Sequence, residues 1–387
     1  MIYLDNAATT QIDPEILKAM CEVMARNYGN PNAQYKLGRE AHDIIEIARG
    51  HVANLIHCSA NNVIFTSGGA EGNSAAIEGL IRTLFSRLKP RILVSEGEHD
   101  SVVRAMESMR AYFEVLPIKL EPDGCVSVSD LESKIDYRTG LVSVMYVNNE
   151  TGAINPVEEI GAICKKYGAL FHTDCVQALG TVEIDVDRIG CDFLTASGHK
   201  IHGPKGSGFL YARQPALLKP IVFGSEEQEF GYRGGTQNVP AIFALGMACK
   251  QLAVEGKKAL LQIVNMKQSF WAQLVSRLEE HELSQYVHIN ANSNLTPGKI
   301  LNFRIDGVDA QTAVLYVDSQ GVCISAGSAC RSLETHPSRV LTAMGLTEEE
   351  AKSSIRVSFS KLNTEEEALK AADIIAEAVQ TLREYWG

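Results

Sequence analysis

The first two-thirds of the chain alternates two kinds of hydrophobic pattern. Short apolar runs rich in β-branched residues, as buried strands have, are separated by longer stretches with the apolar spacing of helices. The predicted strands are 62–66, 91–95, 140–147, 169–173, 192–196 and 207–211. Helical spacing covers 71–88 and 156–167, among other stretches. This alternation indicates an α/β fold with a mostly parallel sheet that is covered by helices on both faces.

The pattern changes near residue 257. An amphipathic helical stretch is followed by a strand, a helix, a loop rich in Gly, Ser and Cys, a strand and a last helix, at 257–280, 299–305, 310–319, 325–332, 354–358 and 364–385. Thr364 and Glu367 form a capping-box signature at the start of that last helix. We predict a large domain over 13–256 and a smaller α+β domain over 257–387 that also takes in 1–12.

The composition is that of an ordinary globular protein, with 45% hydrophobic and 21% charged residues among 387. Such a composition excludes disordered, coiled-coil and collagen-like chains. The net charge of −11 and the absence of a local basic cluster disfavour direct binding to nucleic acid. The N-terminus lacks the regions of a signal peptide, and the apolar run 241–248 is too short for a bilayer. We expect a soluble, cytoplasmic protein without a membrane segment.

Nine cysteines are spread along the chain without a C-x-x-C pair. This pattern argues against a disulfide framework and a zinc site, and it is typical of a reducing compartment, where most of these thiols would be small core residues. Cys330 differs because it lies in a loop of small residues next to Arg331, and reactive thiols occur in accessible, electropositive surroundings. Cys323, on a predicted strand, is its nearest rival, and we expect it in the core.

Candidate chemistry begins with Lys200, which follows the strand 192–196 in a turn rich in glycine. Desolvation at a sheet edge lowers the pKa of a lysine and suits an amine that forms a Schiff base, although a surface turn lysine would have the same local sequence. Asp174 ends the run 169–173 at the same edge, where ligands bind in open α/β sheets. It could pair with the pyridinium nitrogen of a pyridoxal ring or cap a helix, and Gln177 could reach the same pocket.

Residues 66–73 form a glycine-containing turn between a predicted strand and a predicted helix. Backbone N–H groups at a helix N-terminus bind anions, so this turn could hold the phosphate of a cofactor. It matches neither the Walker sequence nor G-x-G-x-x-G. By itself the turn is a weak signal.

Several motifs occur in order along the chain: Y-L-D-N-A-A-T-T at 3–10, V-N-N-E-T-G at 147–152, H-T-D at 172–174, S-G-H-K at 197–200, R-G-G-T at 233–236 and S-A-C at 328–330. Together they resemble the class V aminotransferase-like enzymes of fold type I, which use pyridoxal phosphate. More closely, the chain resembles the cysteine desulfurases of the NifS/IscS type. The resemblance runs from Tyr3 to the last helix.

The resemblance implies a set of cofactor contacts. Lys200 would form the Schiff base with pyridoxal phosphate, Asp174 would pair with the pyridine nitrogen, and Gln177 would contact the ring hydroxyl. His99 would stack on the ring and assist proton transfer. Thr236 would reach the site of the partner subunit, which implies a homodimer. The remaining phosphate contacts would come from Ser197, His199 and the backbone of Gly69 and Ala70.

The resemblance also implies substrate-binding and catalytic roles. Asn149, which would also contact the cofactor, and Arg356 would bind the substrate carboxylate, which a guanidinium fork matches well. Cys330 would attack the sulfur of L-cysteine held on the cofactor, release L-alanine and keep the sulfur as a persulfide. An acceptor protein would then take the sulfur, and iron–sulfur scaffold assembly, tRNA thiolation and other sulfuration pathways are all compatible with this site.

Three features depart from the family pattern. Ala70 stands where the family usually has threonine, Cys175 stands where it commonly has alanine, and 223–229 is more acidic than usual. A selenocysteine lyase or another class V lyase is the alternative enzyme. The alternative that is not an enzyme is an interaction scaffold that has lost its catalytic activity. The missing side-chain hydroxyl at Ala70 supports this alternative.

Overall fold

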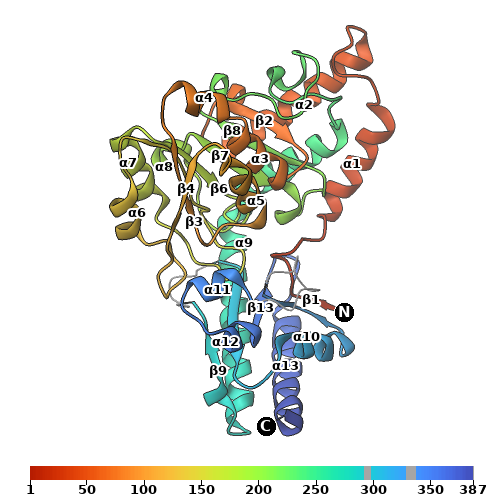
Figure 1. The fold of residues 1–387 in the computed structure, drawn as a ribbon. Helices are drawn as coiled ribbons and strands as arrows, with labels where there is room; N and C mark the ends of the chain where they lie inside the picture. Colours follow the sequence, from red (N-terminus) through yellow and green to blue (C-terminus); the bar gives the residue numbers. More distant parts are fainter. Residues whose placement is uncertain (292–297, 328–336, 387) are drawn as a thin grey trace.

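The structure, a computed structural model, describes residues 1–291, 298–327 and 337–386. Figure 1 shows a larger α/β unit and a smaller unit, with the long helix α9 (Val239–Glu279) extending from one into the other. Cys330 lies outside the described residues, and its role stays a prediction.

The larger unit is built on a seven-stranded sheet with the order β2-β8-β7-β6-β5-β3-β4. Its strands are β2 (Val63–Thr66), β3 (Arg91–Ser95), β4 (Glu114–Ile118), β5 (Thr139–Ser143), β6 (Leu170–Asp174), β7 (Phe193–Ser197) and β8 (Gly208–Ala212). Neighbouring strands are parallel except at β8, which runs antiparallel to β2 and β7. The predicted mostly parallel sheet is confirmed.

Helices cover both faces of this sheet. Alternate strand residues point into two cores, so Val63 and Phe65 belong to one core and Ile64 to the other. One face is covered by α2 (Lys36–Leu55), α6 (Val128–Lys134), α7 (Val157–Tyr167), α8 (Val186–Ile189) and the first part of α9, and the other by α3 (Gly69–Glu78), α4 (Ile81–Ser86) and α5 (Asp100–Met109). The single helix predicted at 71–88 is two helices, because α3 ends at Gly79.

Helix α9 begins earlier than its predicted start at 257. The side chain of Asn238 accepts the N–H of Ala241 and caps the helix, and Pro240 lies in its first turn. Its early residues, such as Leu245, pack in the core of the larger unit, and later ones, such as Phe270, pack in the core of the smaller unit. By length and composition alone α9 could cross a membrane, but a core helix passes the same test, and α9 packs against α2 and α13 (Glu365–Trp386).

The smaller unit contains a four-stranded antiparallel sheet with the order β12-β13-β10-β9. Its strands are β9 (Val287–Ile289), β10 (Ile300–Ile305), β12 (Ser325–Ala326) and β13 (Ser354–Ser358). The N-terminal strand β1 (Ile2–Tyr3) pairs in parallel with β11 (Val322–Cys323), so the chain start joins this unit. Its helices are α10 (Ala310–Ser319), α11 (Arg339–Ala343), α12 (Glu348–Lys352) and α13. The domain boundaries themselves stay a prediction.

The expectation that most cysteines are core residues is only partly right. Cys164, Cys175, Cys191 and Cys249 are buried, whereas Cys58, Cys125 and Cys323 are half-buried and Cys21 is exposed. Cys21 lies on α1 (Pro14–Arg26), whose one buried residue is Ile16. The placement of Cys323 in the core was therefore wrong, because β11 and β1 form only a two-stranded sheet at the margin of the unit.

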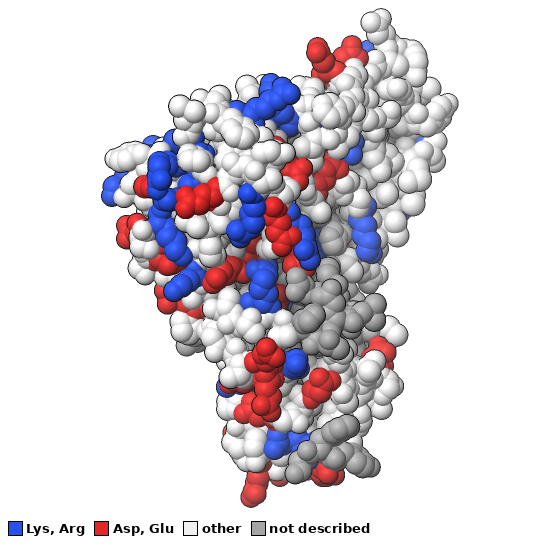
Figure 2. Space-filling model, viewed as in Figure 1, with Lys and Arg blue, Asp and Glu red and all other residues white. Residues whose placement is uncertain are grey.

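Charged side chains of both signs are mixed on the face that Figure 2 shows. Several opposite charges form ion pairs: Arg91 pairs with Glu114 and Asp136, and Lys134 pairs with Asp130. Such pairing reduces the local positive potential that a phosphate backbone would meet.

Candidate active site

A cavity of about 310 Å³ opens at the carboxyl ends of the parallel strands. This edge is where open α/β sheets bind their ligands. Asp174 ends β6 and Ser197 ends β7, while His99 precedes α5. The sequence-predicted residues that line the cavity are Gly69, Ala70, His99, Asn149, Asp174, Gln177, Ser197, His199, Lys200 and Arg356. Thr236 is exposed and is not among the described residues that line it.

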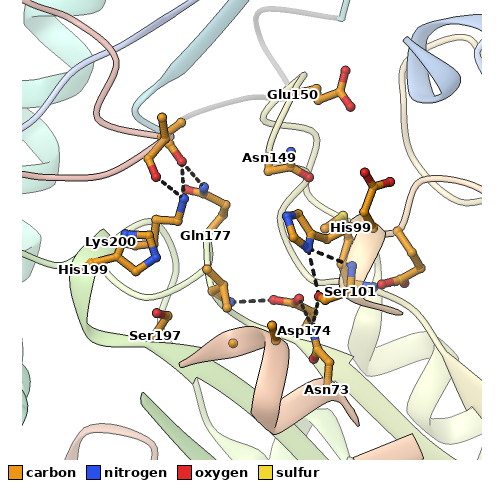
Figure 3. Close-up of a pocket in the computed structure, with 18 of the residues that line it drawn as sticks. Asn73, His99, Ser101, Asn149, Glu150, Asp174, Gln177, Ser197, His199 and Lys200 are labelled. Atoms are coloured by element: carbon orange, nitrogen blue, oxygen red, sulfur yellow. Dashed lines mark hydrogen bonds between the residues drawn. The ribbon is translucent and has the colours of Figure 1, made fainter. Parts of the chain in front are cut away.

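Lys200 points into this cavity from the short turn Gly198–Lys200 that follows β7. Its Nζ donates to the carbonyl oxygens of Ala7 and Ala8, each at 2.6 Å. Figure 3 shows this amine facing the N-terminal segment, with His199 beside it. The alternative of a surface turn lysine does not fit this placement.

Asp174 lies at the base of the cavity and is buried. Its Oδ2 accepts a hydrogen bond from Asn73 Nδ2 at 2.8 Å, and its Oδ1 accepts the backbone N–H of Val176 at 2.9 Å. A turn rather than a helix follows it, so Asp174 is not a helix cap. A carboxylate held in this way remains oriented toward the cavity.

His99 caps α5 with its ring. Nδ1 accepts the backbone N–H of Ser101 and lies 2.8 Å from Ser101 Oγ. Because Nδ1 accepts that N–H, the proton of the neutral ring is on Nε2. Asn73 Nδ2 also donates to Ser101 Oγ, at 2.9 Å, so a hydrogen-bonded chain runs from His99 through Ser101 and Asn73 to Asp174 (Figure 3).

The start of α3 forms another wall of the cavity. The N–H groups in the first turn of a helix have no partner within the helix and can bind an anion. A Cβ at Gly69 would come within 2.8 Å of Val176 Cγ2, so only glycine lets the backbone lie this close. Ala70, Ser197 and His199 line the same cavity. Burial, together with the charges of nearby lysines, lowers the pKa of His199 to about 4.

Gln177 and Arg356 complete the side chains that could recognise a ligand. Gln177 Nε2 donates to the carbonyl oxygen of Ala7 at 2.8 Å. Arg356, on β13, is buried, with Nη2 2.8 Å from Asp5 Oδ1 and Nη1 donating to the carbonyl oxygen of Asn149 at 2.9 Å. Within the described part of the chain, Oε1 of Gln177 and Nε of Arg356 have no hydrogen-bond partner. Both buried atoms therefore have unused hydrogen-bonding capacity, on residues that line the cavity.

Several functional residues were not found from the sequence. Asn73 is the last residue of the segment 66–73 and Ser101 lies two residues after His99, but only the fold brings them together with Asp174. Glu98 also lines the cavity, and burial, with the nearby charge of Asp174, raises its pKa to about 8. Arg339, on α11, donates to the carbonyl oxygens of Glu96 and Glu98 and so ties α11 to the wall of the cavity.

The structure accounts for two of the departures from the family pattern. Cys175 is fully buried and is not among the described cavity-lining residues, and burial raises the pKa of its thiol. In the acidic segment, Glu229 is buried and pairs with Arg49, with 2.8 Å between Oε2 and Nη1, while its Oε2 also accepts the N–H of Phe65. Glu229 therefore anchors its loop to α2 and β2.

Comparison with known proteins places the chain in a family. The model of aminotransferase class-V matches residues 2–370. The chain is 35% identical over 384 residues to the cysteine desulfurase IscS of Dictyoglomus turgidum, covering 99% of this chain and 95% of that protein. It is 36% identical over 386 residues to cysteine desulfurase 2 of Trichormus variabilis, covering 99% and 94%.

Solved structures agree with these relatives. A NifS-like protein superposes with a TM-score of 0.89 at 31% identity, covering 98% of this chain and all (100%) of that chain. A structure of SspA in complex with cysteine has a TM-score of 0.76 at 29% identity, covering 94% of this chain and 100% of that one. The chain therefore belongs to the class-V aminotransferase family and, within it, to the cysteine desulfurases.

Proposed function

We propose that the protein uses pyridoxal phosphate to remove sulfur from L-cysteine, giving L-alanine and a persulfide on Cys330. The observation that carries this proposal is the meeting of Lys200, Asp174 and Arg356 at one cavity, since they supply an amine, a carboxylate and a receptor for a substrate carboxylate. Membership of the family supports the cofactor. The relative solved in complex with cysteine supports the substrate.

The residues of the cavity fit this cofactor. Gly69 keeps the start of α3 close to the cavity, where its N–H groups can meet a phosphate together with Ser197 and His199. A ring N–H of His199 can donate a hydrogen bond to a phosphate oxygen. Gln177 lines the cavity, and its Oε1, which has no partner among the described residues, can accept a hydrogen bond from a ring hydroxyl.

Lys200 and Asp174 would hold the reactive end of the cofactor. Lys200 Nζ would bond to the aldehyde carbon, and Asp174 would keep a proton on the pyridine nitrogen by charge pairing. Bound there, pyridoxal phosphate supplies an electron sink for bonds that break in an attached amino acid. Asn73 keeps the Asp174 carboxylate in orientation through the bond to Oδ2.

Arg356, Asn149 and His99 would act on the substrate. The guanidinium of Arg356 lines the cavity and can bind the α-carboxylate, with Asn149 beside it. His99 would stack on the ring and move a proton through Nε2, because Nδ1 is held as an acceptor by Ser101.

The sulfur step would belong to Cys330. Its thiolate would form an S–S bond with the substrate sulfur as the C–S bond breaks. The electron pair of the broken bond stays with the β-carbon, which takes a proton and leaves as the methyl group of alanine. The two sulfur atoms of the persulfide are together oxidised by two electrons relative to two thiols, and the same two electrons reduce the β-carbon to a methyl group, so the step needs no external oxidant.

Delivery of the sulfur would involve further proteins. We propose a homodimer in which Thr236 reaches the phosphate site of the partner subunit, and an acceptor protein, such as an iron–sulfur scaffold or a thiolation enzyme, that takes the sulfur from Cys330. The net charge of −11 favours a partner protein for any nucleic acid that finally receives it. We also propose a cytoplasmic location.

The test compares three variants in assays of alanine and sulfide released from L-cysteine. Lys200→Ala should lose the visible absorbance of bound cofactor and all turnover. Cys330→Ala should keep that absorbance and lose at least about 100-fold in rate, because the nucleophile is absent. Cys323→Ala is the matched control and should retain wild-type rates. Sulfide release that is unaffected in Cys330→Ala would overturn the persulfide step.

Selenocysteine and cysteine sulfinate separate this function from that of other class V lyases. A desulfurase needs its thiol to abstract sulfur from cysteine, so Cys330→Ala should lose cysteine turnover far more than turnover of the other two compounds. Equal losses for all three compounds would contradict a specific role of the thiol.

A further inference from the structure

Lys299 is a buried lysine that the reaction proposed above does not use. It directly precedes β10, and only 7% of its surface is exposed. Its Nζ donates to the carbonyl oxygen of Lys200 at 3.2 Å. Among the residues that the structure describes, no carboxylate forms an ion pair with it. An ammonium buried without an opposite charge is costly, so its position calls for a reason other than stability.

The surroundings of Lys299 are mostly positive. On the turn after β7 it faces Lys200, His199 and His202, and its charge contributes to the low pKa of both histidines. Arg356, which is paired with Asp5, also acts on Lys299, and Lys361, which is paired with Asp13, acts with Lys299 on His202. The carboxylates of Asp5 and Asp13 thus already have cationic partners.

Lys299 also connects the two halves of the site. Its backbone carbonyl accepts the N–H of Phe359, at 2.9 Å, just after β13. Arg356 lies on that strand, and Lys200 lies on the turn that the Lys299 ammonium contacts. One residue therefore joins the turn with the cofactor lysine to the strand with the carboxylate-binding arginine.

We propose that Lys299 is a positioning residue for Lys200. It fixes the backbone of the Lys200 turn, and its positive charge disfavours protonation of the Lys200 nitrogen. This inference rests on the proposed attachment of the cofactor to Lys200. A nearby positive charge disfavours protonation of that nitrogen, and an unprotonated nitrogen can accept the proton of a substrate that arrives as an ammonium. In the protein without cofactor, burial and the charges of Lys200 and Arg356 lower the pKa of Lys299 to about 7.

The test is a pH titration of the visible absorbance of the holoenzyme, which reports protonation of the nitrogen that joins Lys200 to the cofactor. Lys299→Met removes the charge at similar volume and should raise the midpoint by about half a pH unit or more. Lys299→Arg keeps a charge and should not raise it. Lys267→Met is the matched control, because Lys267 is equally buried, at 7% exposure, but lies on α9, and it should keep the wild-type midpoint.

Lys299→Gln is the second uncharged variant and should shift the midpoint in the same direction as Lys299→Met. A wild-type midpoint in both variants would overturn the inference. The proposed function is tested by a separate observation: wild type should show a visible absorbance band that disappears in Lys200→Ala. A band that is present in wild type but has an unmoved midpoint in the Lys299 variants would overturn only the role of Lys299.

Discussion

At the scale of single residues, the site depends on partners that lie far apart in the chain. Motifs and resemblance predict Asp174 and His99, but they do not predict that Asn73 donates to both Asp174 and Ser101. An asparagine in the first turns of a helix has many possible partners, and only the placement of α3 against β6 selects these two. The same reason hides Lys299, because a lysine before a strand ordinarily reaches solvent.

Arg356→Lys tests whether the guanidinium fork binds the substrate. Lysine keeps the charge but cannot make two parallel hydrogen bonds to a carboxylate, and it cannot also reach Asp5 and the Asn149 carbonyl in the same geometry. We expect kcat/KM for L-cysteine to fall by about 30- to 100-fold, which corresponds to about 2–3 kcal/mol, mainly through KM.

Arg304→Lys is the control for this substitution. Arg304 lies on the neighbouring strand β10 and pairs with Asp306 and Glu350 near the surface, away from the cavity. Steady-state kinetics of the two variants should therefore differ, and equal losses in both would contradict substrate binding by Arg356.

At the scale of elements, hydrophobic periodicity predicts the helices and strands whose apolar pattern is continuous and regular. The ranges of β3, β13 and α10 match their predictions, because each is a clean apolar or amphipathic run. Strand β4 was missed because it lies at the sheet edge, with Glu114 and Pro117 exposed. The start of α9 was missed because its first turns are apolar on several faces and pack between units, so they show little amphipathic period.

At the start of α3, substitutions at two adjacent positions should change the affinity for pyridoxal phosphate in opposite directions. Gly69→Ala places a methyl group 2.8 Å from Val176 Cγ2 and pushes the phosphate-binding turn away, so the apoprotein should bind pyridoxal phosphate about 10-fold more weakly. Ala70→Thr adds a hydroxyl next to the same turn and should tighten binding by about 1 kcal/mol, or roughly fivefold.

Gly50→Ala is the control for both changes. Gly50 lies on α2, and a Cβ there would meet nothing within 4 Å, so cofactor binding should not change. Fluorescence titration of the apoprotein with pyridoxal phosphate measures all three affinities. Weaker binding in Ala70→Thr would contradict a phosphate site at this helix start.

At the scale of the whole molecule, the site lies where two independently packed cores meet. Lys200, Asp174 and His99 come from the larger unit, whereas Arg356 lies on β13 of the small antiparallel sheet and Lys299 directly precedes its strand β10. Helix α9 contributes to both cores, and the N-terminal segment reaches both Lys200 and Arg356 through Ala7 and Asp5. Local sequence patterns indicate each unit, but they do not predict how the two units are positioned relative to each other. That relative position decides the geometry of the site.

This arrangement buries Lys299 between the units, and global stability should therefore depend on pH. Its pKa is about 7 in the folded protein and 10.5 as a free side chain. Between these values the unfolded chain binds a proton that the folded protein does not, so stability rises with pH over this window and is lost as pH falls toward 7.

Lys299→Met removes this pH-dependent contribution to the free energy of unfolding. The free energy of unfolding of wild type relative to Lys299→Met should rise by about 1 kcal/mol per unit between about pH 7.5 and 9.5, measured by urea unfolding of the apoprotein. Lys258→Met, at an exposed position of α9, should show a constant difference from wild type, and a constant difference for Lys299→Met as well would contradict a buried, pH-dependent charge between the units.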